Sequence, residues 1–215
     1  MHTAGDPVLI GLTGNIATGK STVARMLVDL GAEDIDADKV AHGVMRPGEP
    51  AHSAIVDAFG AEVLSADGTI DRKRLGQLVF SDPEALEHLE AIVHPTTVRA
   101  IEDRIAGSPA DVIVIEAIKL FESGLAQRCD IVWVTTCRRD QQIQRLMEGR
   151  GLTRAEARQR VDAQRPQEER AALADVVIDN SGSLAETRQQ VAEAWNRTVR
   201  EKRASAGESL GSTSS

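Results

Sequence analysis

Short apolar runs and amphipathic stretches alternate along most of the chain. Runs of consecutive apolar residues, typical of strands buried on both faces, lie at 8–13, 112–115, 131–134 and 176–178. A further short strand is expected at 33–36. Strands of this kind, separated by helical stretches, predict an α/β domain with a mostly parallel sheet.

The first strand leads into a glycine-rich turn and an amphipathic helix. After Gly14, apolar residues from Val23 to Leu30 recur at spacings of three, four and seven, which places them on one face of a helix that starts near Lys20. Gly31 is placed to end this helix. The predicted order is therefore a strand, a glycine-rich loop and a helix.

Two further segments differ from this core. Residues 50–107 have a largely helical pattern, with turns at Gly60 and Asp67-Gly68 and a helix start at Ser81-Asp82-Pro83. Residues 138–170 are polar and rich in arginine, with almost no large apolar residues after Leu152. We expect this second segment to pack little and to move.

These patterns divide the chain into four parts. The parts are a core (1–46, 108–137 and 171–203), a helical insertion (47–107), a helical lid (138–170) and a tail (204–215). The core closes with a helix at 183–200 that Ser183 caps. The tail is rich in Ser, Gly and Ala, a composition that cannot support a core, so it is predicted to be disordered.

Composition and charge narrow the class of protein. With three Phe, two Trp and no Tyr, the core must be aliphatic, and a net charge of -8 disfavours nucleic acid or an anionic membrane as a general partner. Cys129 and Cys137 form neither a disulfide framework nor a zinc motif. Without an export signal or a run of ~18 apolar residues, a cytoplasmic protein is expected. Its oligomeric state is open, with a monomer slightly favoured.

The turn after the first strand carries a phosphate-binding motif. Residues Gly14, Asn15, Ile16, Ala17, Thr18, Gly19, Lys20 and Ser21 satisfy GxxxxGK[ST] between a predicted strand and a predicted helix. Backbone N–H groups and the helix N-terminus converge on the phosphates, and Lys20 adds a charge near the β- and γ-phosphates. The hydroxyl of Ser21 is a ligand for Mg²⁺, so ATP with Mg²⁺ is the expected cofactor. Thr22 follows at the start of the helix.

The rest of the sequence favours a kinase over a switch GTPase. The chain lacks a guanine-reading Asn-Lys-x-Asp segment, and the Asp-x-x-Gly match at 57–60 lies in a helical region. An enzyme that phosphorylates a small acceptor needs a carboxylate near the γ-phosphate and mobile cations that neutralise the developing charge.

Asp36 and Asp38 are the candidates for the carboxylate. We expect their strand to lie next to the P-loop strand, so that both aspartates reach the carboxyl edge of the sheet. If the segment is extended, the two side chains share a face. The alternative role is capping of the following helix, and both roles can coexist.

The candidate cations are the arginines of the lid. They are Arg138, Arg139, Arg145, Arg150, Arg154, Arg158, Arg160, Arg165 and Arg170. Most arginines in such a run are solvated helix surface, and we expect Arg145 and Arg160 to reach phosphate.

With these motifs, the chain resembles the dephospho-coenzyme A kinase family from Val8 to about Val199. The similar segments include 10–14, 19–24, 30–32, 35–38 with His42, 47–50, 59–60, 67–68, 71–72, 75–76, 79–80, 94–95, 120–122, 145–147, Gln164 and 174–180. The resemblance implies a three-layer α/β/α P-loop NTPase fold, an insertion that holds the acceptor and an arginine-bearing lid over ATP.

The resemblance also assigns roles to residues. It implies that Asp38 is the base for the ribose 3′-hydroxyl of dephospho-coenzyme A, with Lys20 and Arg145 completing the catalytic set. Asn180 joins the ATP site, and the expected acceptor contacts are Thr13, Asp36, His42, Arg72, His94, Glu116 and Lys119. Structural alternatives remain for two of these segments: Asp71 caps a helix that begins at Arg72, and Pro95 occupies the first turn of a helix after His94.

Three departures from the family pattern leave other functions open. Asn15 and Ala17 stand where the family usually has glycine, and Ala17 either keeps φ negative or costs up to ~1–2 kcal/mol. Lys119 is placed to pair with Glu116 or Glu122 or to bind substrate phosphate, and Arg150 follows Gly149 where the lid usually has arginine. The alternatives are a kinase for a nucleoside monophosphate or shikimate, or an ATP-binding protein without turnover.

Overall fold

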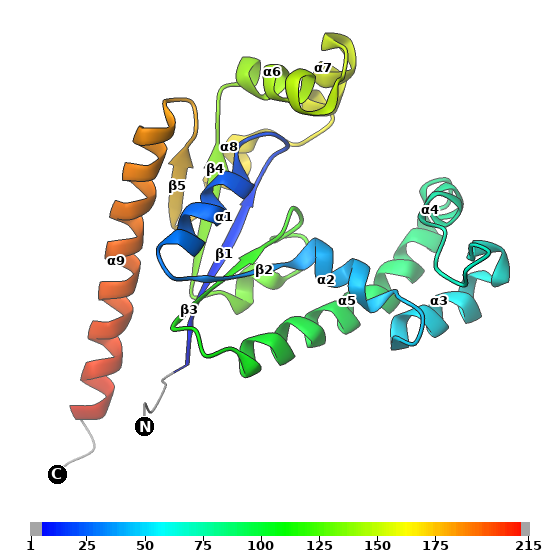
Figure 1. The fold of residues 1–215 in the computed structure, drawn as a ribbon, viewed down its shortest axis with the longest axis horizontal. Coiled ribbons are helices and arrows are strands. Elements are labelled where there is room, and N and C mark those ends of the chain that lie inside the picture. Colours follow the sequence, from blue (N-terminus) through cyan, green and yellow to red (C-terminus); the bar gives the residue numbers. More distant parts are fainter. Residues whose placement is uncertain (1–5, 212–215) are drawn as a thin grey trace. The chain divides into compact units, whose positions relative to one another are not determined.

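Five strands form one sheet in the computed structural model, which describes the backbone of residues 6–211 and the side chains of 6–199. The strands are β1 (Val8–Gly14), β2 (Glu33–Asp36), β3 (Val112–Glu116), β4 (Ile131–Thr136) and β5 (Val176–Asp179). Their order is β2-β3-β1-β4-β5, and β1 pairs in parallel with both β3 and β4 (Figure 1). The predicted parallel sheet of an α/β fold is confirmed.

The order of the strands corrects one expectation. β3 lies between β1 and β2, so β2 is the edge strand rather than the neighbour of the P-loop strand. The carboxylate at the end of the neighbouring strand is Glu116, because β3 ends there. The prediction had placed β2 beside β1 because the two strands follow one another in the sequence. In a parallel sheet, strands are joined by crossover connections, so consecutive strands need not be adjacent.

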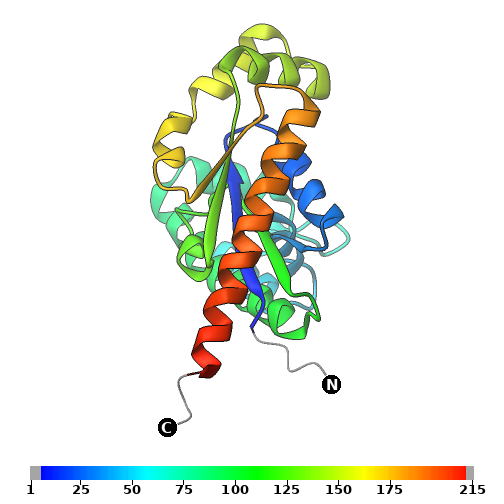
Figure 2. The same ribbon diagram turned by 90° about the vertical axis from the view of Figure 1, so that its left-hand side faces the viewer.

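Helices cover both faces of the sheet. On one face, α1 (Lys20–Asp29) and α9 (Leu184–Gly211) pack on the strands through a buried apolar cluster that includes Ile10, Leu27 and Trp133 (Figures 1 and 2). The opposite face carries η2 (Leu125–Arg128) and α8 (Gln167–Ala171). A Cβ on Gly11 would lie 2.9 Å from Cys129 Sγ, so glycine lets this second layer approach β1 closely.

The arginine-rich segment is better packed than its sequence predicts. It forms α6 (Arg139–Arg150), α7 (Arg154–Asp162) and α8. Ile143, Leu146 and Ala157 are buried in a small cluster with Ile16 and Ala17 of the P-loop. The expectation of weak packing was wrong, because a few apolar residues suffice when the surface they cover is the P-loop itself.

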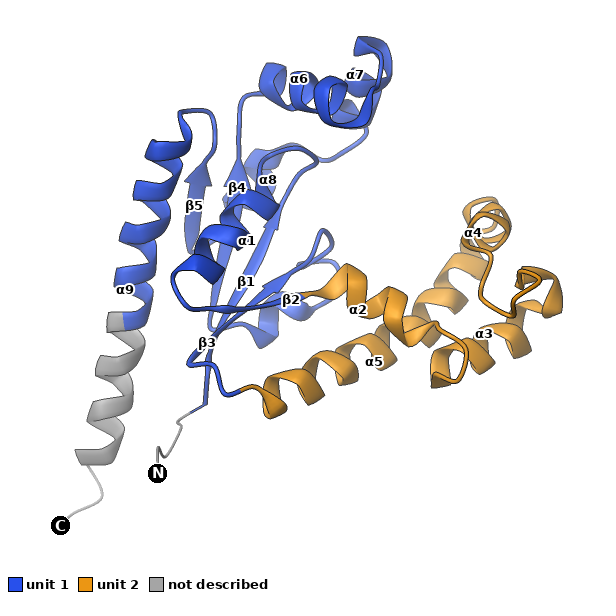
Figure 3. Ribbon diagram, in the orientation of Figure 1, with its two compact units in different colours: residues 1–35, 109–215 blue, residues 36–108 orange. Residues whose placement is uncertain are grey.

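The chain divides into two compact units, residues 1–35 with 109–215 and residues 36–108 (Figure 3). The second unit contains α2 (Ala37–Val44), α3 (Pro50–Phe59), η1 (Ala61–Val63), α4 (Arg72–Phe80) and α5 (Pro83–Gly107). It begins earlier than the predicted insertion (47–107), because α2 packs against α5. Ile55, Phe59 and Leu75 lie in its own apolar core.

Local capping explains where these helices start. The side chain of Asp71 accepts hydrogen bonds from the backbone N–H groups of Lys73 and Arg74, and Asp82 caps α5 in the same way. The predicted starts at Asp71 and at Asp82-Pro83 are confirmed. Pro95 lies inside α5, so its assignment to a first helical turn was wrong.

The closing helix begins as predicted. Ser183 and Glu186 exchange hydrogen bonds at the N-terminus of α9, in a capping box. The predicted end of this helix near residue 200 is wrong, because α9 continues to Gly211, so the backbone of residues 204–211 is helical rather than disordered. Residues 212–215 of the predicted tail lie outside the described residues. Among the described residues, no helix combines the length and the apolar character that crossing a membrane requires.

Candidate active site

The P-loop joins the carboxyl end of β1 to the first turn of α1. Gly14 is required because a Cβ there would overlap Thr135 Oγ1, and Gly19 because it has φ 94° and faces Asn180. Inside the loop, Thr18 Oγ1 donates to Asn15 O (2.8 Å) and lies 2.7 Å from Thr135 Oγ1. The loop is therefore held from within and by β4.

Ala17 adopts a left-handed backbone conformation with φ 59°. It is the one residue other than glycine with positive φ in the described part of the chain. An L-residue in this conformation costs about 1–2 kcal/mol. The chain therefore keeps the loop geometry that glycine usually provides and accepts the strain, rather than keeping φ negative at Ala17.

Lys20 forms an ion pair with Glu116. Its Nζ lies 2.5 Å from Glu116 Oε1, and the two side chains are 13% and 10% exposed. Ser21 Oγ lies 3.5 Å from the same carboxylate oxygen. The ends of β1 and β3 thus bring a cation, a carboxylate and a hydroxyl to one point at the carboxyl edge of the sheet.

The oxygens at this point suit Mg²⁺. A hydroxyl and a carboxylate are hard ligands, and Mg²⁺ typically takes one or two protein oxygens and completes its shell with water and substrate phosphates. In the described residues no three His, Cys, Asp or Glu side chains form a dedicated metal site. Ser21 and Glu116 therefore fit a magnesium ion that arrives with a nucleotide.

Arg145 contacts one backbone carbonyl of the P-loop and one of the segment after β5. Nη1 donates to Ala17 O (3.1 Å) and Nη2 donates to Asn180 O (2.8 Å). The side chain of Asn180 in turn donates to Thr18 O (2.7 Å). Arg145 and Asn180 thus join α6, the P-loop and the segment after β5. Arg145 anchors backbone here, and its expected contact with phosphate stays a prediction.

The structure places other residues of the first unit as follows. Thr13 is fully buried and donates its hydroxyl hydrogen to Ile118 O (3.2 Å), so that hydroxyl is used inside the fold. Lys119 is exposed in the turn after β3. Arg160 is exposed on α7, and Arg150 is exposed at the end of α6.

Glu122, in the segment between β3 and η2, forms an ion pair with Arg170 of α8. Arg170 Nη2 lies 2.7 Å from Glu122 Oε1. Burial alone would raise the pKa of Glu122, but a backbone hydrogen bond and Arg170 outweigh burial and hold it below its usual value. This pair connects the loop that follows Glu116 to the end of the arginine-rich segment.

The residues of the second unit that were expected to contact the acceptor lie on its helices or at a helix start. Asp36 caps α2 through Lys39 N, as its alternative role predicted, and Asp38 is exposed in the first turn. The segment is helical from Ala37, so Asp36 and Asp38 do not share a face of a strand. His42 lies four residues after Asp38, which puts the two on the same side of α2. Arg72 and His94 are exposed on α4 and α5.

Two glutamines at the P-loop were not recognised as site residues from the sequence. Gln142 Nε2 donates to Ile16 O (2.9 Å), and Gln164 Oε1 accepts from Ile16 N (2.7 Å). Gln142 is only 4% exposed. A glutamine in a polar helix gives no signal of its own, although Gln164 belongs to a segment similar to the family.

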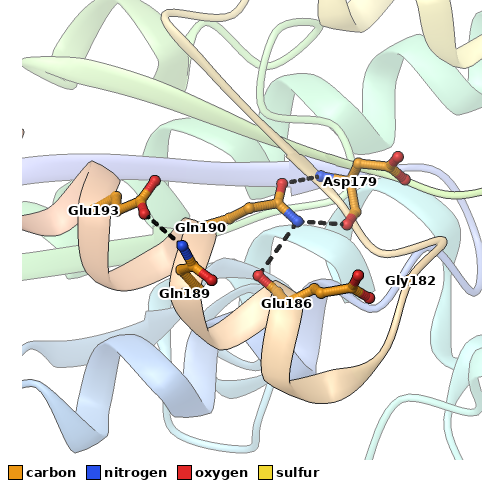
Figure 4. A pocket seen from close by; sticks show the side chains of 6 residues that line it. All are labelled: Asp179, Gly182, Glu186, Gln189, Gln190 and Glu193. Atoms are coloured by element: carbon orange, nitrogen blue, oxygen red, sulfur yellow. Dashed lines mark hydrogen bonds between the residues drawn. The ribbon is translucent and has the colours of Figure 1, made fainter.

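A separate pocket lies beside the first turns of α9. It has a volume of about 360 Å³ and is lined by Asp179, Gly182, Glu186, Gln189, Gln190 and Glu193 (Figure 4). Its carboxylates would repel a triphosphate, so this pocket does not compete with the P-loop as a nucleotide site.

Comparisons with known proteins show which family the chain matches. The family model described as dephospho-CoA kinase matches residues 8–186. The dephospho-CoA kinase of Geobacter metallireducens is 48% identical over 195 residues, which cover 89% of this chain and 97% of that protein. The dephospho-CoA kinase of Carboxydothermus hydrogenoformans is 45% identical over 186 residues, covering 85% and 90%.

Solved structures show the same architecture. TT1252 from Thermus thermophilus has a TM-score of 0.80 and 35% identity, covering 90% of this chain and 98% of its own. Dephospho-CoA kinase from Campylobacter jejuni has a TM-score of 0.67 and 29% identity over the same shares. Shikimate kinase from Bacteroides thetaiotaomicron, with a TM-score of 0.50 and 16% identity, shares the fold alone.

Proposed function

Because the chain belongs to the dephospho-CoA kinase family, we propose that it transfers the γ-phosphoryl group of ATP to the ribose 3′-hydroxyl of dephospho-coenzyme A. The products are coenzyme A and ADP. The observation that carries this proposal is the P-loop with the Lys20–Glu116 pair at its mouth, in a chain that matches the family over most of its length.

The P-loop residues bind and neutralise the nucleotide in this proposal. Lys20 exchanges Glu116 for the β- and γ-phosphates, since a phosphate group carries more charge than the carboxylate that now holds the ammonium group. Ser21 and the freed Glu116 would hold Mg²⁺, which would neutralise phosphate charge. Arg145 keeps Ala17 and Asn180 in place on the side of α6.

The second unit supplies the acceptor side. Asp38 is exposed on α2 and orients the 3′-hydroxyl and accepts its proton, while His42, Arg72 and His94 contact the rest of the acceptor. Positioning should contribute more than proton removal, because phosphoryl transfer has a loose transition state. Arg160 and Arg150 are the exposed arginines that would approach the phosphates from the arginine-rich helices.

A coupled assay of ADP release tests the proposal. Dephospho-coenzyme A, adenosine monophosphate, cytidine monophosphate and shikimate are offered in turn with ATP and Mg²⁺. Release with dephospho-coenzyme A alone, and a product phosphorylated at the ribose 3′-position, are expected. Release with another acceptor would assign the chain to a different substrate, and ATP binding without any release would make it a non-catalytic member of the family.

A further inference from the structure

The peptide groups at the tip of the P-loop are held by side chains from a distant part of the chain. Gln164 Oε1 accepts from Ile16 N at 2.7 Å, and Gln142 Nε2 donates to Ile16 O at 2.9 Å. Each of these contacts joins residues more than 120 positions apart. Both polar groups of the Ile16 backbone are therefore bound by glutamine side chains.

Neighbouring groups form further hydrogen bonds with the same loop. Asn15 Nδ2 donates to Arg165 O at 2.8 Å, next to the contact of Gln164. Arg145 Nη1 donates to Ala17 O at 3.1 Å. We call these groups, Gln142, Arg145, Gln164 and the carbonyl of Arg165, the P-loop clamp. The clamp contacts three successive residues of the loop, Asn15, Ile16 and Ala17.

The clamp acts where the loop is strained. A phosphate-binding loop needs successive N–H groups that converge on the anion, and convergence requires a residue in the left-handed conformation. Gly19, with φ 94°, and Ala17, with φ 59°, both have this conformation, and alanine, unlike glycine, does not adopt it readily. An outside restraint is therefore needed to keep the loop in its binding conformation before nucleotide arrives.

The direction of the contacts fits this role. The carbonyl groups of Ile16 and Ala17 are drawn toward Gln142 and Arg145, on the side of α6. Apolar packing of Ile16 and Ala17 against Ile143 secures the same side. These contacts hold both carbonyl groups on the α6 side, while the N–H of Thr18 donates to Asn15 O at 3.3 Å inside the loop.

We propose that Gln164, together with Gln142, is a positioning residue that holds the strained P-loop ready for the triphosphate. The glutamines act through the backbone of Ile16 and need not touch the nucleotide. The inference rests on the proposed function only in taking ATP as the ligand. It predicts that loss of either glutamine weakens ATP binding and leaves the acceptor side unaffected.

Replacement of the Gln164 amide tests the proposal. Gln164→Met keeps the length of the side chain but removes the acceptor, whereas Gln164→Glu keeps an acceptor for Ile16 N. Calorimetry should show ATP with Mg²⁺ binding about fivefold more weakly to the methionine variant, the factor that corresponds to one neutral hydrogen bond of ~1 kcal/mol. KM for ATP should rise by a similar factor while KM for dephospho-coenzyme A stays unchanged.

Amide hydrogen exchange measures directly how well the clamp protects the N–H of Ile16. Without nucleotide, the Ile16 N–H should exchange faster in Gln164→Met than in the unmodified protein, and Gln164→Glu should restore its protection. Gln159→Met is the matched control, because Gln159 is an exposed glutamine on α7. Gln142→Met removes the donor to Ile16 O and should reproduce the loss of ATP affinity if the first variant folds poorly.

The outcomes separate this inference from the proposed function. If the unmodified protein does not bind ATP, the proposed function fails. If the unmodified protein binds ATP and both methionine variants bind it equally well, with unchanged exchange at Ile16, the clamp has no positioning role. A fall in melting temperature without any change in ATP affinity would also overturn the inference, since it would make the glutamines purely structural.

Discussion

Loss of the Lys20 charge should both abolish phosphoryl transfer and destabilise the fold. Lys20→Met keeps the apolar stem of the side chain but leaves Glu116, which is 7% exposed, without the cation that now pairs with it. A buried pair that loses one partner costs about 3–5 kcal/mol. Because roughly a tenth of each side chain still meets water, we expect about 2–4 kcal/mol here.

A double variant distinguishes the cost of an unpaired buried charge from the loss of phosphoryl transfer. In Lys20→Met/Glu116→Gln no buried charge is left unpaired, so most of the lost stability should return while transfer remains absent. For a chain of this length, 1 kcal/mol shifts the melting temperature by about 2–4 °C. The single variant should therefore melt about 4–16 °C below the unmodified protein, and the double variant should melt close to the unmodified protein.

Thermal melting and urea titration, each beside the ADP-release assay, measure the effect. Lys39→Met is the control, since Lys39 pairs with Asp36 at 3.0 Å but is 79% exposed, and a surface pair contributes about 0–1 kcal/mol. A single variant that melts with the unmodified protein would show that the pair does not support the fold. A double variant no more stable than the single one would show that the unpaired charge is not the cause.

Three further predictions concern separate parts of the molecule. Asp38→Asn should lower kcat by about 10²–10⁴-fold with little change in ATP affinity, and an unchanged kcat would show that Asp38 is only a surface residue. Asp36→Ala should instead lower the free energy of unfolding by ~1 kcal/mol, because it removes a helix cap. Desolvation of the partly buried Cys129, with the nearby Asp130 carboxylate, raises its pKa to about 12, so iodoacetamide at pH 8 should label this thiol much more slowly in the native protein than after unfolding; equal labelling rates would contradict the raised pKa. The pKa of Glu122 is lower in the folded than in the unfolded protein, so this carboxylate contributes stability above its unfolded pKa, and that stability is lost as pH falls through its folded pKa. Glu122→Gln should therefore lose less stability on acidification than the unmodified protein. An identical decrease of stability at low pH in both proteins would argue against the pair with Arg170.

Local signals in the sequence determined the elements and their ends. The apolar runs at 112–115 and 131–134 became β3 and β4, and the P-loop motif lies between a strand and a helix as predicted. The caps at Asp71, Asp82 and Ser183 were readable because a cap and the N–H groups that it satisfies lie within four residues. Such interactions do not depend on where the rest of the chain goes.

Tertiary structure decided which elements meet. β3, and not β2, lies beside the P-loop strand, so Glu116 rather than Asp36 ends the neighbouring strand. Pro95 looked like a helix start, yet it lies inside α5. In both cases the local pattern was compatible with two arrangements, and packing of distant segments selected one of them.

The P-loop clamp could not be predicted from the sequence. Ala17 could be read as a position that either keeps φ negative or is strained, and the observed φ of 59° shows that the strain is accepted. Gln142 and Gln164 carry no local signal, because their partner, the Ile16 backbone, is 126 and 148 residues away. A single sequence specifies the residue types and their periodicity, but a hydrogen bond between a side chain and a distant backbone exists only once the fold has brought the two together.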